Sequence, residues 1–294
     1  MPRVTGRISA AFLEADGKTR LGDRYHAYPL KIAKAFPFDD GQLGVYMMDA
    51  SPGIMSGDRY ELDWHFGAHT KVYVTNQSYT KVHPQRLDET GQAVHPPSEQ
   101  TQRLTLGQGA YVEYMPEPLT LYKDACFHST TDVRMERGST LILSEVVCPG
   151  RTQRGELFRY CRYRSRLAVR FGDEWVYCGR QQVEPGVQRL ASIGAWGSFT
   201  HMGTLYVFSE LADAAMAEAL RIFMNGERDG FDAVARGRQD ASSGLYAGIS
   251  RTYKHGLIVS VMGRKAYEIQ DYLERAWAFI RSRYFASAPL LVRK

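Results

Sequence analysis

Apolar and polar side chains alternate through most of the first two thirds of the chain, a pattern typical of half-buried β-strands. Turn signals separate these runs about every ten residues, which favours stacked sheets over strand–helix–strand units. A hairpin turn is predicted at Asp16-Gly17 and a long loop over residues 83–100. The predicted strands are residues 6–13, 43–48, 60–66, 70–75, 102–106, 110–115, 125–135, 140–147, 157–170 and 174–183.

The hydrophobic pattern becomes helical after Phe208. Ser209 can cap a helix over residues 210–224, and a second helix is predicted over residues 265–283, with strands between them at 245–252 and 257–262. We therefore predict a mainly β (α+β) fold, in which layered antiparallel or mixed sheets carry two principal helices in the C-terminal third. We expect one domain over residues 1–294, β-rich over 1–208 and helix-containing over 209–294. We recognise no internal repeat.

The composition is that of an ordinary globular protein: 294 residues, 44% hydrophobic and 23% charged, with a net charge of +5. The four cysteines form no CxxC pair, so a zinc ribbon has no support, and no apolar run is long enough to span a membrane. The first residues lack the apolar segment of a signal peptide. We therefore expect a cytoplasmic protein with reduced thiols and no membrane partner.

Seven arginines fall between residues 151 and 170, and Arg162, Arg164 and Arg166 share one strand face at a period of two. Such a run among aromatic residues could be a nucleic-acid platform. It could also be a solvated strand face or a surface for an acidic protein. The low net charge and the lack of a nucleic-acid motif favour the last two readings, so no nucleic-acid partner is expected.

Other candidate chemistry is weaker. His65 and His69 lie four residues apart across a predicted turn, and two ligands do not define a zinc site. Asp58 with Glu145 or Glu156 could form the acid/base pair of a β-rich hydrolase or a carbohydrate-binding protein. Alternatively, Asp58 ties its loop to backbone N–H groups.

Four short segments stand out by their order along the chain. They are Pro52-Gly53-Ile54-Met55-Ser56-Gly57-Asp58, Thr75-Asn76-Gln77-Ser78-Tyr79-Thr80-Lys81-Val82-His83, Tyr114-Met115-Pro116-Glu117-Pro118 and Gly150-Arg151-Thr152-Gln153-Arg154-Gly155-Glu156. Together they resemble the GG-x-x-x-GD, TTQ-x-x-x-K-V-Y, LPEP-type and GR-x-x-x-GE motifs of the UreD/UreH urease accessory family. The likeness covers nearly the whole chain and is looser in the C-terminal half. Pro52, Ser56 and Asn76 depart from the family pattern.

The resemblance implies a non-catalytic chaperone for urease maturation. Members of this family act with a helical accessory protein, UreF, and a GTPase, UreG, on the urease apoprotein. The partners expected here are therefore UreF-like and UreG-like proteins and that apoprotein. Nickel is expected in transit, with no permanently bound cofactor and no stable metal site.

The second segment loses its apolar face yet contains no turn signal, which calls for an explanation. Our hypothesis is that Thr75, Gln77, Thr80 and Lys81, with Asp58, Glu145 and Glu156, form a buried polar network that lines or braces a nickel passage. The alternative is a purely structural polar core. On the second helix, Tyr267, Trp277 and Phe279 are candidate anchors for a partner interface, or part of the core.

Overall fold

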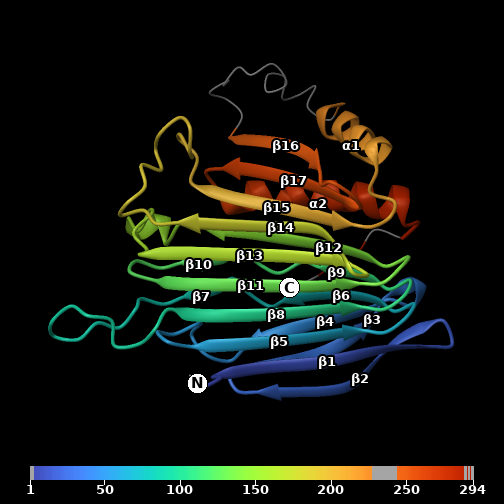
Figure 1. The fold of residues 1–294 in the computed structure, drawn as a ribbon, viewed down its shortest axis with the longest axis horizontal. Helices are drawn as coiled ribbons and strands as arrows, with labels where there is room; N and C mark the ends of the chain where they lie inside the picture. Colours follow the sequence, from blue (N-terminus) through green and yellow to red (C-terminus); the bar gives the residue numbers. More distant parts are fainter. Residues whose placement is uncertain (1–2, 227–243, 288–289, 291, 293–294) are drawn as a thin grey trace.

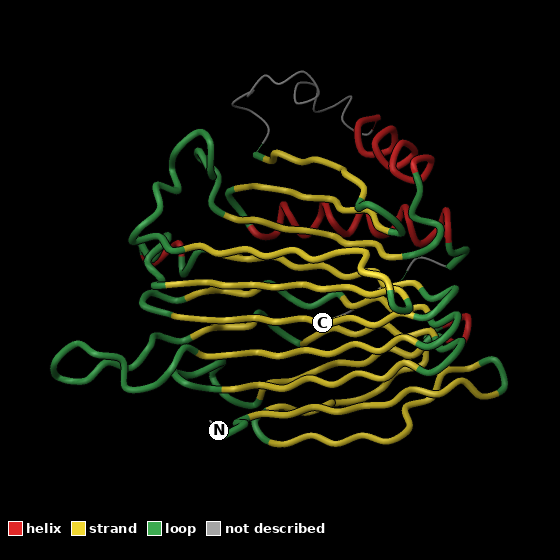
Figure 2. Tube along the Cα trace, viewed as in Figure 1, coloured by secondary structure: helices red, strands yellow, loops and turns green. Residues whose placement is uncertain are grey.

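The computed structural model describes residues 3–226, 244–287, 290 and 292 as two stacked β-sheets with two helices on one side (Figures 1 and 2). The seven-stranded sheet has the order β14-β13-β11-β8-β5-β1-β2 and the ten-stranded sheet the order β16-β17-β15-β12-β9-β6-β4-β3. In the second sheet β10 also pairs with β12, and β7 pairs with β10. Both sheets contain parallel and antiparallel pairs. The prediction of a mainly β fold with mixed sheets and two C-terminal helices is confirmed.

The elements have the following bounds. The strands of the seven-stranded sheet are β1 (Gly6–Ala15), β2 (Lys18–Ala27), β5 (Arg59–Phe66), β8 (Ser98–Leu106), β11 (Cys126–Met135), β13 (Arg162–Phe171) and β14 (Glu174–Val183). Those of the ten-stranded sheet are β3 (Leu30–Pro37), β4 (Leu43–Asp49), β6 (Lys71–Asn76), β7 (Thr80–Val82), β9 (Tyr111–Tyr114), β10 (Leu119–Leu121), β12 (Thr140–Cys148), β15 (His201–Phe208), β16 (Leu245–Arg251) and β17 (Gly256–Gly263). The helices are α1 (Ala214–Gly226) and α2 (Ala266–Tyr284).

From β4 to β13 the chain crosses between the two sheets again and again, so that strands of successive crossings pair in parallel within each sheet. Parallel strands are usually joined through a helix. Here the connection is a strand of the opposite sheet, and no helix is needed. This winding is a structural repeat that was not recognised from the sequence. Its units share an apolar–polar alternation and an in-register strand pairing, but not the same residues at equivalent positions.

The two ends of the winding differ. At one end, tight turns join the sheets at 67–70, 107–110 and 136–139, each closed by a backbone hydrogen bond from the fourth residue to the first. Their third residues, His69, Gly109 and Gly138, all have positive φ near 60–70°. At the other end the connections are long loops, over residues 50–58, 83–97, 115–125 and 149–161, and all four motif segments lie there or lead into it.

The sheets enclose one apolar core, and the outer face of the ten-stranded sheet packs against the helices to form a second. A buried polar cluster fixes α2 on that face. Glu113 of β9, which is fully buried, accepts hydrogen bonds from Tyr111 Oη at 2.6 Å, Gln42 Nε2 at 2.8 Å and Trp277 Nε1 at 2.8 Å, and forms an ion pair with Arg281. Every member of the cluster therefore finds a partner away from water.

Several sequence predictions were wrong in detail. The first helix begins at Ala214 rather than residue 210, because Asp213 caps it by accepting the N–H of Met216, while Ser209 bonds Thr140 instead. Residues 157–161 belong to a loop and not to the following strand. Strands β2, β3, β7, β10 and β15 were not predicted. In β2 most side chains are exposed, which removes the alternating pattern.

Candidate functional site

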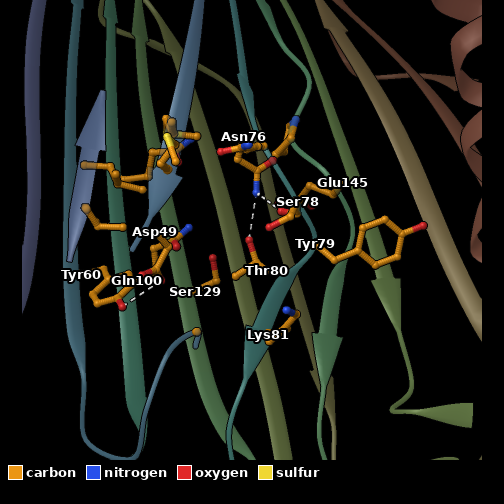
Figure 3. Close-up of a pocket in the computed structure, with 18 of the residues that line it drawn as sticks. Asp49, Tyr60, Asn76, Ser78, Tyr79, Thr80, Lys81, Gln100, Ser129 and Glu145 are labelled. Atoms are coloured by element: carbon orange, nitrogen blue, oxygen red, sulfur yellow. Dashed lines mark hydrogen bonds between the residues drawn. The ribbon is translucent and has the colours of Figure 1, made fainter. Parts of the chain in front are cut away.

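Polar side chains interrupt the apolar core between the two sheets. On the seven-stranded sheet, Tyr60, Gln100 and Ser129 are in register on β5, β8 and β11 and point inward, with Gln102 and Thr131 two residues further on. Because strands alternate their side chains, these residues share the face of Leu104 and Val133. The opposite sheet contributes Asn76 and Glu145. The result is a polar cavity close to the long-loop end of the sandwich (Figure 3).

The cavity has a volume of about 170 Å³. That is room for about five water molecules, and its polar lining could hydrogen-bond them. The lining includes two carboxyl side chains, Asp49 and Glu145, together with amides, hydroxyls and Lys81. It thus offers mainly neutral oxygen groups with a small amount of charge.

Hydrogen bonds within the protein hold part of the polar lining in place. The hydroxyl of Tyr60 donates to Asp49 Oδ2 at 3.0 Å, and that of Tyr114 donates to Gln102 Oε1 at 2.8 Å. Burial raises the pKa of both tyrosines well above the ordinary value, so each hydroxyl stays protonated and acts as a donor. The side chains that shape the cavity are therefore fixed in orientation.

Asn76 organises the loop that covers the cavity. Its amide nitrogen donates to the Ser78 carbonyl at 3.0 Å and to Thr80 Oγ1 at 3.1 Å, and its carbonyl oxygen accepts the N–H of Glu117 at 2.5 Å (Figure 3). A threonine, which has a single hydroxyl, could not make all three bonds. The strand thus gives way to polar residues because its end becomes a hydrogen-bonded lid over the cavity.

Glu145 differs from Asp49, the other carboxyl of the lining, which is hydrogen-bonded to Tyr60. It lies on β12 and points into the cavity, and no described side chain forms a hydrogen bond or ion pair with it. Burial raises its carboxyl pKa to about 7. Its charge is in turn one cause of the raised pKa values of Tyr163 and Tyr206, whose burial is the larger cause. The carboxyl can therefore gain or lose a proton near neutral pH.

The structure brings together only part of the predicted polar network. Gln77, Thr80, Lys81 and Glu145 line the cavity. The hydroxyl of Thr75 instead donates to the Met115 carbonyl at 2.6 Å. Asp58 and Glu156 are not among the lining residues, so neither can pair with Glu145 across this cavity.

Asp58 and Glu156 each fix a loop at the same end of the sandwich. Asp58 Oδ2 accepts the N–H of Met55 at 2.7 Å, which is the structural alternative considered for it from sequence. Glu156 binds the guanidinium of Arg151 through both oxygens and accepts the N–H of Lys123. Each loop also contains a glycine before its carboxylate, Gly53 in the first and Gly150 in the second. A Cβ atom added at these glycines would lie only 2.4 Å and 2.2 Å from a backbone carbonyl oxygen, so no larger residue fits there without a shift. These glycines and carboxylates explain two of the four motifs as loop anchors.

The candidate interface residues of α2 have different surroundings. Tyr267 is exposed. Trp277 is buried in the Glu113 cluster, and Phe279 stacks on Phe223 of α1 at 4.4 Å between ring centroids. Trp277 therefore belongs to the core, which is the alternative left open from the sequence, and it is not a surface anchor. Phe279 joins the two helices.

Sequence reasoning missed Asp49, Tyr60, Gln100, Gln102, Tyr114, Ser129 and Thr131 as cavity residues. A signal was present: Gln100 and Gln102 occupy the positions where the period of two in β8 demands apolar side chains, as do Ser129 and Thr131 in β11. Two neighbouring polar interruptions on one inward face indicate a shared internal cavity.

The described part of the chain contains no cluster of three or more histidine, cysteine or carboxylate side chains arranged to hold a metal ion. Its four cysteines are free thiols. No helix among these residues is long and apolar enough to cross a membrane.

Comparison with known proteins identifies the family. Residues 4–294 match the family model described as UreD urease accessory protein. The chain belongs to the UreD urease accessory protein family. A urease accessory protein UreD of Acetivibrio thermocellus is 32% identical over 280 residues, covering 93% of this chain and 97% of that protein. One from Lachnoclostridium phytofermentans is 26% identical over the full length of both chains.

The three departures from the family motifs can be placed in the structure. Ser56 accepts the N–H of Arg86 at 2.9 Å, and the carbonyl of Pro52 lies 3.2 Å from His83 Nε2. Asn76 is the organising residue of the lid. Each departing residue thus makes contacts of its own at the long-loop end.

Proposed function

We propose that this chain assists urease maturation as a non-catalytic scaffold and conduit, and that nickel passes through its polar cavity on the way to the urease apoprotein. Family membership supports the accessory role and a non-catalytic one. The partners in this proposal are a UreF-like helical protein, a UreG-like GTPase and the apoprotein, in the cytoplasm.

The observation that carries the conduit proposal is the cavity lining. Amide and hydroxyl oxygens with one unpaired carboxyl can replace part of the hydration shell of a divalent cation. They would bind nickel more weakly than a set of imidazoles or thiolates would. A transit site needs this balance, because an ion that binds tightly does not leave.

A matched pair of variants tests the conduit. Ser129→Phe places a ring in the cavity, whereas Thr101→Phe adds the same ring to the outer face of the neighbouring strand. Urease is co-expressed with its accessory proteins and either variant, and its nickel content and activity are measured. We expect Ser129→Phe to lower the nickel content of urease about tenfold or more, because the ring would block the proposed path. Thr101→Phe should leave the nickel content unchanged.

Omitting the chain altogether separates the two levels of the proposal. If urease is equally nickel-loaded and active without the chain, the accessory role fails. If omission abolishes loading but Ser129→Phe supports it normally while remaining folded and bound to its partners, the accessory role stands and the conduit fails.

A further inference from the structure

The outer face of the seven-stranded sheet is uncovered in the described structure, because α1 and α2 pack on the other sheet. At one side of this face, β11, β13 and β14 present six arginines outward, named here the arginine face: Arg134, Arg162, Arg164, Arg166, Arg170 and Arg180. Two carboxylates, Asp132 and Glu184, accompany them. The surplus of four positive charges is most of the +5 net charge of the whole chain.

Internal ion pairs neutralise only part of this charge. Arg166 contacts Asp132 at 2.7 Å, while Arg162 and Arg164 share Glu184 at 3.0 Å and 3.6 Å. Arg134, Arg170 and Arg180 have no carboxylate partner among the described residues. They are therefore open to an anionic partner.

The register makes the arrangement unfavourable for folding. Arg166 lies directly opposite Arg180 in the antiparallel pair, and Arg134 lies beside Arg170 in the parallel pair. Like charges in such positions destabilise a sheet. A face selected only for stability would place carboxylates there, so these arginines point to binding.

The same face has the composition of a protein interface. The Arg170 guanidinium lies 3.9 Å from the ring centroid of Trp175, which is 49% exposed. Tryptophan and arginine are the residues most enriched at energetically important contact positions. In addition, β14 is the edge strand of its sheet, so its outer backbone groups are open to a further strand.

We propose that the arginine face docks an acidic segment of a partner protein in extended conformation, lying along β13 and β14. In an extended segment, alternate side chains point to one side. Carboxylates at every second position would thus match the period of two at which the outward side chains of β13 recur, among them Arg166 and the unpaired Arg170. Guanidinium groups can bind such carboxylates through two parallel hydrogen bonds. The inference does not depend on the cavity or on nickel transfer.

Binding of synthetic peptides to the full chain tests the proposal. The probes are an alternating Glu-Ser peptide, a peptide of the same composition in Glu-Glu-Ser-Ser order, and single-stranded DNA of equal charge. We expect the alternating peptide to bind most tightly, with an affinity that falls with salt, and to protect β13 and β14 from amide hydrogen exchange.

Two triple variants distinguish binding at the arginine face from a general response to net charge. Arg134→Glu, Arg170→Glu and Arg180→Glu together are expected to weaken peptide binding about tenfold or more. Lys18→Glu, Lys31→Glu and Arg283→Glu change the net charge equally at exposed sites elsewhere and should leave binding within about twofold. If the first triple does not fold, the corresponding Arg→Gln triple replaces it.

Any of three results would overturn the proposal. The first is that the alternating peptide does not bind at low salt. The second is that both triples weaken binding equally, which would show a response to net charge alone. The third is that the DNA binds more tightly through the same arginines, which would make the face a phosphate-binding surface.

Discussion

Two carboxyl side chains, Glu113 fully buried and Glu145 half-buried, lie on opposite faces of the ten-stranded sheet, and their surroundings are opposite as well. Glu113 faces the helices and is bound by Tyr111, Gln42, Trp277 and Arg281. Glu145, on the adjacent strand β12, faces the other sheet and has no partner among the described side chains. Glu113 leaves water on folding and recovers its hydrogen bonds within the protein, whereas Glu145 loses only part of its contact with water and recovers none from the described side chains.

The difference separates a structural role from a functional one. A buried charge that is fully paired fixes the geometry of its partners, here the position of α2. A buried carboxyl without partners weakens the fold, because its charged form is poorly solvated. An apolar residue at position 145 is expected to make the fold more stable, so stability does not explain the carboxyl.

The largest effect is expected at Glu113. Glu113→Ala leaves the guanidinium of Arg281 buried without its carboxylate and should lower the free energy of unfolding by about 3–5 kcal/mol. Urea unfolding followed by tryptophan fluorescence measures this loss. Glu89→Ala, on an exposed loop, is the control and should change the free energy by less than about 0.5 kcal/mol.

A double change sharpens the interpretation. Glu113→Leu with Arg281→Leu removes both charges and should recover most of the stability lost by Glu113→Ala, since an apolar pair can replace a buried ion pair. If Glu113→Ala lowered the free energy of unfolding by less than about 1 kcal/mol, water would have to reach the cluster. Glu113 and Glu145 would then not differ in the way proposed.

At Glu145 the expected effect depends on pH. Its pKa of about 7 in the folded protein is above the ordinary value of 4.5, so the folded state binds the proton more tightly than the unfolded state. Stability is therefore highest below the ordinary pKa, falls as the pH rises between these values, and levels off above about 7. A shift of this size corresponds to at most about 3 kcal/mol, less if the cavity is hydrated.

Glu145→Gln removes this dependence. The variant should match the original chain near pH 4 and exceed its stability by up to about 3 kcal/mol at pH 8, as measured by urea unfolding at each pH. Gln100→Glu would serve as a companion that adds a carboxyl to the same cavity, with the pH dependence expected to grow. Equal stability of Glu145→Gln and the original at both pH values would show that the carboxyl is solvated or paired.

The sequence predicted the fold better than the site, for a physical reason. Alternation and helical period report which face of an element is buried, and this sufficed for most strands, for α2 and for the overall class. It does not report pairing, so the parallel winding and its repeat were not foreseen. The loop-anchoring role of Asp58 was foreseen as an alternative, because a carboxylate after a glycine commonly binds backbone N–H groups.

The site depends on contacts between residues distant in sequence. Lys81 and Glu145 were proposed together and do line one cavity, whereas Glu156, proposed with them, lies in a separate loop. The Glu113 cluster joins positions 42, 113 and 281, and no local pattern links them. Only the tertiary structure shows which polar residues pair with one another and which are left for a ligand.

The smallest effect, and the one that separates the cavity carboxyl from the loop carboxyls, is expected at Glu156. The Arg151 guanidinium, followed by the N–H of Lys123, holds the pKa of Glu156 below its usual value. Its contribution to stability is therefore present above the ordinary carboxyl pKa and is lost as the pH falls, the opposite direction to Glu145. Glu156→Gln should cost less than about 1 kcal/mol at neutral pH, because the pair is partly exposed, and nothing at low pH. Urea unfolding of both variants across the same pH range measures how each carboxyl's contribution to the free energy of unfolding changes with pH. A contribution that rises with pH for Glu145, or one that falls with pH for Glu156, would contradict the distinction between these two carboxyls.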